Sequence, residues 1–95
     1  MEISKSSNVV TIAGNIKSVS DFQSIKSTVD SLKNSTSTIT LDIQDSISIT
    51  SSVIGYLNKL VLKDSIDLNL KVGNEQLLHL LEDLNLTSVF KARKA

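Results

Sequence analysis

The chain has 95 residues with ten basic and ten acidic side chains, so its formal net charge is zero. One domain fits this length, because compact domains run from about 50 to 250 residues. A balanced charge gives no electrostatic reason to expect a nucleic acid as the main partner, or an anionic membrane surface. The absence of cysteine excludes disulfides, thiol catalysis and thiolate metal sites.

No segment approaches the roughly 20 apolar residues of a membrane span, so membrane insertion is not expected. The opening "MEISKSSN" lacks the apolar stretch of a signal peptide. These two observations predict a cytoplasmic protein.

Strand-like and helix-like patterns alternate in the first part of the chain. "EIS" (residues 2–4) and "VVTIAG" (residues 9–14) predict two short strands around a polar turn. Spacings of three and four then predict an amphipathic helix, buried through Phe22, Ile25, Val29 and Leu32. Ser18 can cap this helix with Asp21 three residues on, and Ser20 is an alternative cap.

The same alternation continues toward the C-terminus. A strand is predicted from Ile39, Leu41 and Ile43, and another from Ile66, Leu68, Leu70 and Val72. A helix from about Ser52 to Lys63 lies between them, buried through Val53, Ile54, Leu57, Leu60 and Val61. A last helix from Asn74 to Leu84 is expected to turn inward Leu77, Leu78, Leu80, Leu81 and Leu84. Asn85 stands where helices often end in a left-handed residue, and residues 91–95 are expected to form a frayed basic tail.

The predicted order is ββαβαβα, in which the strand–helix–strand units imply parallel neighbours and right-handed crossovers. The later strands expose one polar side, with Thr40, Asp42, Asp67, Asn69 and Lys71. Strands buried on both faces would instead read as continuous apolar runs. We therefore expect a single α/β domain over residues 1–95, with a four-stranded mixed sheet and three main helices largely on one face. The polar face is either solvated or used by a partner.

Catalytic motifs are absent from the sequence: it has no P-loop, dinucleotide fingerprint, HExxH or nucleophile elbow. The single histidine, His79, falls opposite the leucines of the last helix, where Glu75 and Asp83 lie within pairing distance at four-residue spacing. A solvated helix histidine is expected, because no acid, base or nucleophile converges on it. We predict no catalytic residue, cofactor or metal ligand, and an enzyme is disfavoured.

The outward side of the second predicted helix is more informative. A projection at 100° per residue collects there Ser51, Ser52, Gly55, Lys59 and Leu62. A glycine inside a helix costs about 1 kcal/mol relative to alanine, so Gly55 suggests that another backbone comes close, and Leu62 would add apolar contact. The alternative is that one glycine and one exposed leucine are ordinary on a surface helix.

The adjacent serines Ser51 and Ser52 have two interpretations. A serine at a helix N-terminus accepts hydrogen bonds from free backbone N–H groups, which contributes about 1 kcal/mol. The same location favours a phosphate, because the free N–H groups and the positive end of the helix dipole stabilise negative charge. Capping is favoured on physical grounds, and the phosphate interpretation stays open.

The segment "LDIQDSISITSSVIGYLNKL" (residues 41–60), followed by "IDLNLKVGNEQLLHLLEDLNLTSVF" (residues 66–90), resembles the STAS domain of bacterial anti-sigma-factor antagonists. Leu41-Asp42-Ile43 matches the end of the family's strand, and Ser51-Ser52 matches its serine pair. Gly55 matches the second glycine of the family's motif. Asn85-Leu86 with Phe90 matches the closing element of the family. Thr50 stands where the family has an aspartate before the serines, and Val53 stands where it has its first glycine. The resemblance covers nearly the whole chain.

The resemblance implies a module that binds other proteins. Its partner would be an anti-sigma factor or a regulator of the serine kinase or phosphatase type, and phosphorylation would release it. Ser51 corresponds to the phosphate acceptor, with Ser52 and Thr50 as lesser candidates. The implied docking residues are Thr50, Ser51, Ser52, Gly55, Lys59 and Leu62. Other relatives act as phosphorylation-independent adaptors in signalling or lipid-transport complexes, and the oligomeric state stays open.

Overall fold

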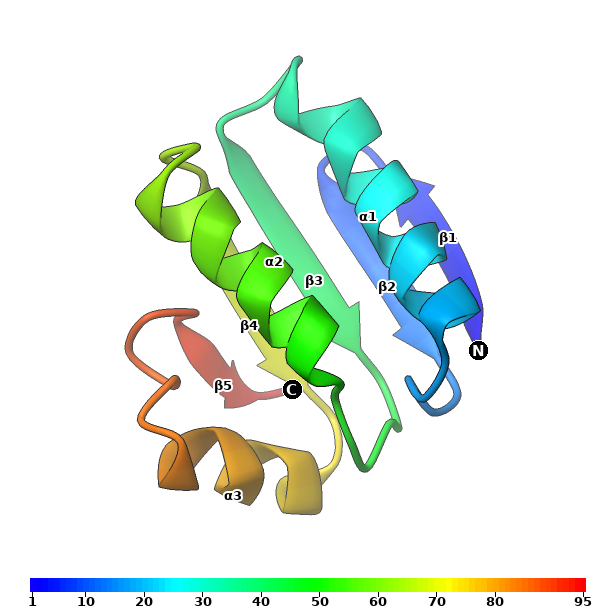
Figure 1. Cartoon of the computed structure of the whole chain (residues 1–95), viewed down its shortest axis with the longest axis vertical. Helices are drawn as coiled ribbons and strands as arrows, with labels where there is room; N and C mark the ends of the chain where they lie inside the picture. Colours follow the sequence, from blue (N-terminus) through cyan, green and yellow to red (C-terminus); the bar gives the residue numbers. More distant parts are fainter.

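The computed structural model describes all of residues 1–95 and has the order β1-β2-α1-β3-α2-β4-α3-β5 (Figure 1). The strands are β1 (Glu2–Ser6), β2 (Val9–Ala13), β3 (Thr38–Ile43), β4 (Asp67–Val72) and β5 (Ala92–Lys94). The helices are α1 (Val19–Lys33), α2 (Ser51–Leu62) and α3 (Glu75–Asp83). None of the three helices is long and apolar enough to cross a membrane.

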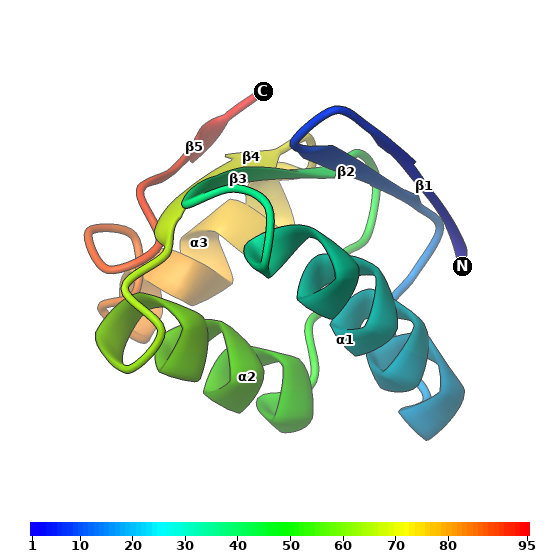
Figure 2. The same cartoon turned by 90° about the horizontal axis from the view of Figure 1, so that it is seen from above.

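The strands form one mixed sheet in the order β1-β2-β3-β4-β5, so spatial order follows chain order. The β1–β2 pair is antiparallel and the other pairs are parallel. Right-handed crossovers that all advance in one direction place their helices on the same side of a sheet. Figure 2 shows this arrangement, with all three helices below the sheet and nothing covering its other face. The predicted mixed sheet with helices on one face is confirmed.

The predicted number of strands is wrong, because the sheet has five strands rather than four. Residues 91–95 were expected to fray, yet β5 runs parallel to β4, with Ala92 opposite Leu70. The Leu70 N–H donates to the carbonyl of Phe90 at 3.2 Å. Since the Phe90 side chain is fully buried, it anchors the segment that leads into β5.

The alternation along the strands separates an apolar face from a polar one. Register places Ile12, Ile43 and Val72 in one row across three strands, and all three are buried on the helix side. The neighbouring row on the open face contains Thr11, Asp42, Lys71 and Arg93, none of which is buried. The core therefore lies entirely between the sheet and the helices.

The helix ends agree with two of the predictions. Ser18 and Asp21 form a reciprocal capping box at the start of α1, and Asn85 adopts a left-handed conformation after α3, with φ of 59°. The leucines of α3 differ from expectation: Leu80 and Leu84 are 37% and 48% exposed. A nine-residue helix that meets the sheet near its β4–β5 edge buries one narrow stripe, which contains Leu77 and Leu81.

Candidate functional site

Helix α2 carries the candidate site, and its inner side fixes how the helix lies. The buried stripe contains Val53, Tyr56, Leu57 and Leu60. Ile54 and Val61, which the projection placed in the core, are only partly buried against it. Compared with the projection, the buried stripe is rotated toward α1. The rotation brings Tyr56 into contact with Asp30 of that helix, a contact that the projection did not include.

Thr50 caps α2, and neither of the two serines does. The Thr50 backbone is extended, its Oγ1 accepts from the Val53 N–H at 3.3 Å, and its carbonyl accepts from the Ile54 N–H at 3.0 Å. Ser51 and Ser52 are the first two helical residues, so the prediction that they cap the helix is wrong by one residue. Their hydroxyls make no hydrogen bond and are exposed.

The outer side of α2 is an exposed stripe formed by Ser51, Ser52, Gly55, Lys59 and Leu62, called here the outer stripe. Leu62 is 74% exposed, and a Cβ placed on Gly55 would meet nothing within 4 Å. Lys59 is partly held by Asp64, with 3.7 Å between Nζ and Oδ2. Thr50, also predicted to contact a partner, is half-buried at the start of the stripe.

The N-terminus of α2 is electrostatically uncompensated. The backbone N–H groups of Ser51 and Ser52 have no hydrogen-bond partner. The first turns of α1 and α3 carry Asp21 and Glu75, whereas the first turn of α2 carries no acidic residue. Because the start of a helix bears partial positive charge, this end can accept added negative charge.

Val53, where the STAS pattern has a glycine, does not crowd the surface. Its side chain is 1% exposed and belongs to the core cluster. An incoming protein would therefore meet the hydroxyls of Ser51 and Ser52 without meeting this side chain.

The loop before α2 is hydrogen-bonded to the β2–α1 loop through a buried serine that sequence reasoning missed. Ser46 is fully buried, and its Oγ accepts from the Ile16 N–H at 3.0 Å while donating to the Ser48 carbonyl at 2.7 Å. The Ile47 N–H donates to Asn15 Oδ1 at 3.0 Å, which ties the same two loops together. These hydrogen bonds hold the segment that leads into α2 against the β2–α1 loop. Hydroxyl residues are so frequent in the chain that nothing marked Ser46 beforehand.

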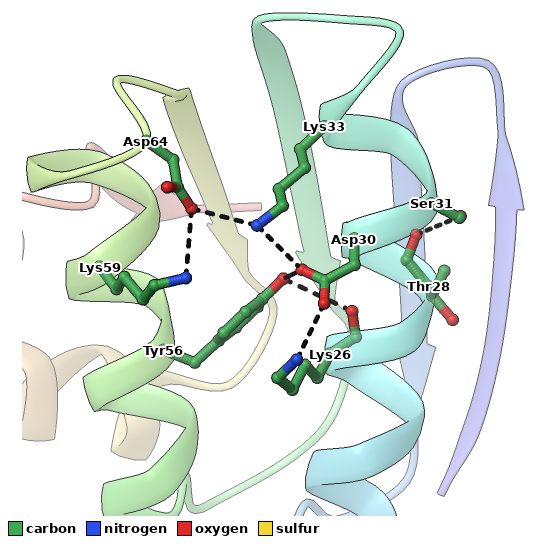
Figure 3. Close-up of polar contacts among 8 residues, drawn as sticks. All are labelled: Lys26, Thr28, Asp30, Ser31, Lys33, Tyr56, Lys59 and Asp64. Carbon is green, nitrogen blue, oxygen red and sulfur yellow. Dashed lines mark hydrogen bonds and ion pairs between the residues drawn. The ribbon is translucent and has the colours of Figure 1, made fainter.

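A polar network joins α1 and α2 and includes Lys59 of the outer stripe (Figure 3). Tyr56 Oη donates to Asp30 Oδ1, and Asp30 also pairs with Lys26 at 3.0 Å and with Lys33 at 3.4 Å. Lys33 continues to Asp64 at 3.3 Å. An aromatic contact adds to the network, because the rings of Phe22 and Tyr56 pack edge to face with their centroids 6.2 Å apart.

The network shifts the titration of its members. Burial alone would raise the pKa of Asp30, but hydrogen bonds from Tyr56 and Lys26 and the charge of Lys33 outweigh it and lower that pKa to about 2. Burial and the neighbouring Asp30 carboxylate raise the pKa of Tyr56. The tyrosine therefore stays protonated as a donor, and it joins the helices at a point that hydrophobic periodicity does not reveal.

The surface hollows and the single histidine lie apart from the outer stripe. The two surface hollows are polar and lie beside β1 and at the β1–β2 turn, away from the start of α2. His79 is exposed and forms no ion pair with Glu75 or Asp83.

Comparisons with protein-family models, with curated proteins and with solved structures find no match.

Proposed function

We propose that this chain is a STAS-type domain that binds a regulatory protein through the outer stripe of α2 and is switched by phosphorylation of Ser51. The partner is an anti-sigma factor or a regulator of the serine kinase or phosphatase type. The observation that carries the proposal is the division of roles at the helix start. Thr50 provides the cap, so the exposed Ser51 hydroxyl is free to react.

A phosphate on Ser51 would change the stripe in two ways. It adds about −1.5 to −2 charges and strong acceptor oxygens, which the unpaired N–H groups and the positive helix end stabilise. It also places this negative charge on a surface that otherwise offers hydroxyls, Gly55, Leu62 and the ammonium group of Lys59. A partner packed on Leu62 and Gly55 would have to desolvate the phosphate, so phosphorylation releases it.

The fold and the loops support this proposal. The β3–α2 loop is pinned through Ser46, so the position of Ser51 is preset before a partner arrives. An acceptor held in place needs little ordering on binding, and preorganisation of this kind favours recognition.

The test is phosphorylation in an extract of the source cells supplied with ATP, read by intact mass and peptide mapping. We expect one phosphate on the wild type and on Ser52→Ala, and none on Ser51→Ala. Ser35→Ala is the matched control, because Ser35 is an exposed serine far along the chain in the α1–β3 loop. A phosphate that persists on Ser51→Ala, or a wild type that acquires none, contradicts the proposed switch.

A second candidate is a phosphorylation-independent adaptor that docks through the same stripe. Leu62 and Gly55 favour it, because both are open and neither requires a phosphate for contact. Under this function, Ser51→Ala and Ser51→Asp bind the partner equally well. If only Ser51→Asp binds the partner more weakly, the result supports the phosphorylation switch instead of the adaptor.

A further inference from the structure

The outer edge of β1 presents backbone groups that pair with nothing. The carbonyls of Asn8 and Ile12 accept from N–H groups of residues 40 and 44, so these two residues direct their backbone toward β3. The alternate residues of β2 therefore face β1, where register pairs Val9 with Ser6 and Thr11 with Ser4.

It follows that the intervening residues of β1, Ile3 and Lys5, direct their N–H and carbonyl groups away from the sheet. The sheet ends at β1, and Figure 2 shows no element beyond it. Unpaired strand edges of this kind are templates for another strand.

A groove of about 350 Å³ runs between this edge and α1. Its lining is polar, with Ile3 as the single apolar member, and contains Ile3, Ser4, Lys5, Ser27, Thr28 and Ser31. Thr28 and Ser31 lie on the flank of α1 turned toward β1, while Asp30 lies on the opposite flank (Figure 3). A small molecule is a poor fit, because ligand pockets are mostly apolar and enclosed.

Lys5 supplies the only charge in the groove, and no lining residue is acidic. Its Nζ donates to Ser31 Oγ at 2.9 Å, so the ammonium group lies across the groove. Proteins usually guard an edge with several charged side chains, with a covering helix or loop, or with a very short strand. The other edge, β5, has three residues and carries Arg93 and Lys94, whereas β1 has five residues and its one lysine is turned onto α1.

We propose that the β1 edge binds an extended acidic peptide segment of another protein as a sixth strand. Its backbone pairs with the free groups of Ile3 and Lys5, and an acidic side chain enters the groove to meet Lys5 Nζ and the hydroxyls of α1. Strand addition gains affinity from the main-chain bonds and specificity from the alternate side chains. This surface is separate from the outer stripe of α2, so the proposal stands independently of the Ser51 switch.

A second copy of this chain is a worse occupant than an acidic peptide. Antiparallel pairing of two β1 strands about Ser4 sets Ile3 of one copy opposite Lys5 of the other. The two Lys5 side chains would then be diagonal neighbours on the helix side, about 7–8 Å apart, with no carboxylate in the groove to neutralise them.

The test follows backbone amide exchange by NMR on addition of a synthetic peptide, acetyl-(Glu-Val)₃-amide. We expect exchange of the Ile3 and Lys5 amides to slow as the peptide is added. The unpaired amides of Ser51 and Ser52 serve as internal controls, and their exchange stays fast. Unchanged exchange at Ile3 and Lys5 overturns the proposal.

Matched probes separate backbone pairing from charge. A peptide N-methylated on its pairing edge should not bind, and the lysine analogue acetyl-(Lys-Val)₃-amide should bind more weakly than the glutamate peptide.

Lys5→Ala should raise the dissociation constant of the glutamate peptide about twofold to fivefold, and Lys63→Ala should leave it unchanged. Equal binding of the lysine peptide overturns the acidic preference. Protection of Ile3 and Lys5 that grows with protein concentration alone identifies a second copy as the occupant instead.

Discussion

The two sides of α2 differ in their contacts with the rest of the chain. The inner side is closed by core packing through Leu57 and Leu60, and by the hydrogen bond from Tyr56 to Asp30. On the outer side, Ser51 and Leu62 expose their side chains, and a Cβ placed on Gly55 would meet nothing within 4 Å. Changes on the inner side should therefore alter folding, whereas changes on the outer side should alter binding alone.

The largest effect is expected from leucines on opposite sides of the helix. Leu57 is fully buried, so Leu57→Ala should lower the free energy of unfolding by about 2–5 kcal/mol through lost burial and a cavity. Leu62 is 74% exposed, and Leu62→Ala should change that free energy by less than about 0.5 kcal/mol. Urea denaturation followed by circular dichroism measures both. Similar losses for the two variants would remove the distinction between the sides.

Tyr56→Phe tests the polar part of the inner side. The change removes a hydrogen bond to a charged group, and we expect a loss of about 1.5–3 kcal/mol in the free energy of unfolding. Tyr56 is only 6% exposed. Phenylalanine keeps the same buried ring and removes only the hydroxyl group. A variant as stable as the wild type in urea would show that the hydrogen bond from Tyr56 to Asp30 does not stabilise the contact between α1 and α2.

The pH dependence of stability probes the same network. The pKa of Asp30 is lowered from 3.8 to about 2, so its carboxylate stabilises the folded state above pH 3.8, and that contribution is lost as the pH falls toward about 2. Urea midpoints measured through this range should fall more steeply for the wild type than for Asp30→Asn. Parallel curves for the two proteins would contradict the assigned pKa.

Thr50→Ala and Ser51→Ala separate neighbouring hydroxyls. Thr50 caps α2 through the Val53 N–H, so its loss should lower the free energy of unfolding by about 1 kcal/mol. The Ser51 hydroxyl bonds to nothing, and its removal should leave the thermal midpoint within error of the wild type. A drop for Ser51→Ala equal to that of Thr50→Ala would return the capping role to the serine.

Gly55→Ala should have a small effect of the opposite sign. Nothing lies within 4 Å of the added Cβ, so alanine should raise the free energy of unfolding by about 0.5–1 kcal/mol through helix propensity. If a partner backbone approaches Gly55, the same variant binds that partner more weakly. A variant that is more stable and binds as well as the wild type assigns no docking role to this glycine.

Regular periodicity explains why much of the fold could be predicted. The alternation at Ile39, Leu41 and Ile43 and the helical spacing from Phe22 to Leu32 are set by burial on one side, so the sequence records them directly. The capping box of Ser18 and Asp21 is equally local, because both partners lie within one turn.

The features that were missed depend on contacts far apart in the chain. Strand β5 has only three residues, too few for a pattern, and it forms because Phe90 is buried beside β4. Tyr56 can be buried because Asp30, on another helix, accepts the hydrogen bond that its hydroxyl donates. The cap fell on Thr50 instead of a serine because several adjacent hydroxyls are chemically equivalent until the backbone fixes which one precedes the helix.

Under the proposed switch, the outer stripe of α2 binds a partner protein, and negative charge at Ser51 releases that partner. The partner is first captured on the wild-type protein and purified. The most direct measurement is then the dissociation constant of this purified partner for the wild type, Ser51→Ala and Ser51→Asp. We predict that Ser51→Ala binds as the wild type does, and that Ser51→Asp binds about tenfold or more weakly. Equal affinity of all three proteins would contradict the switch.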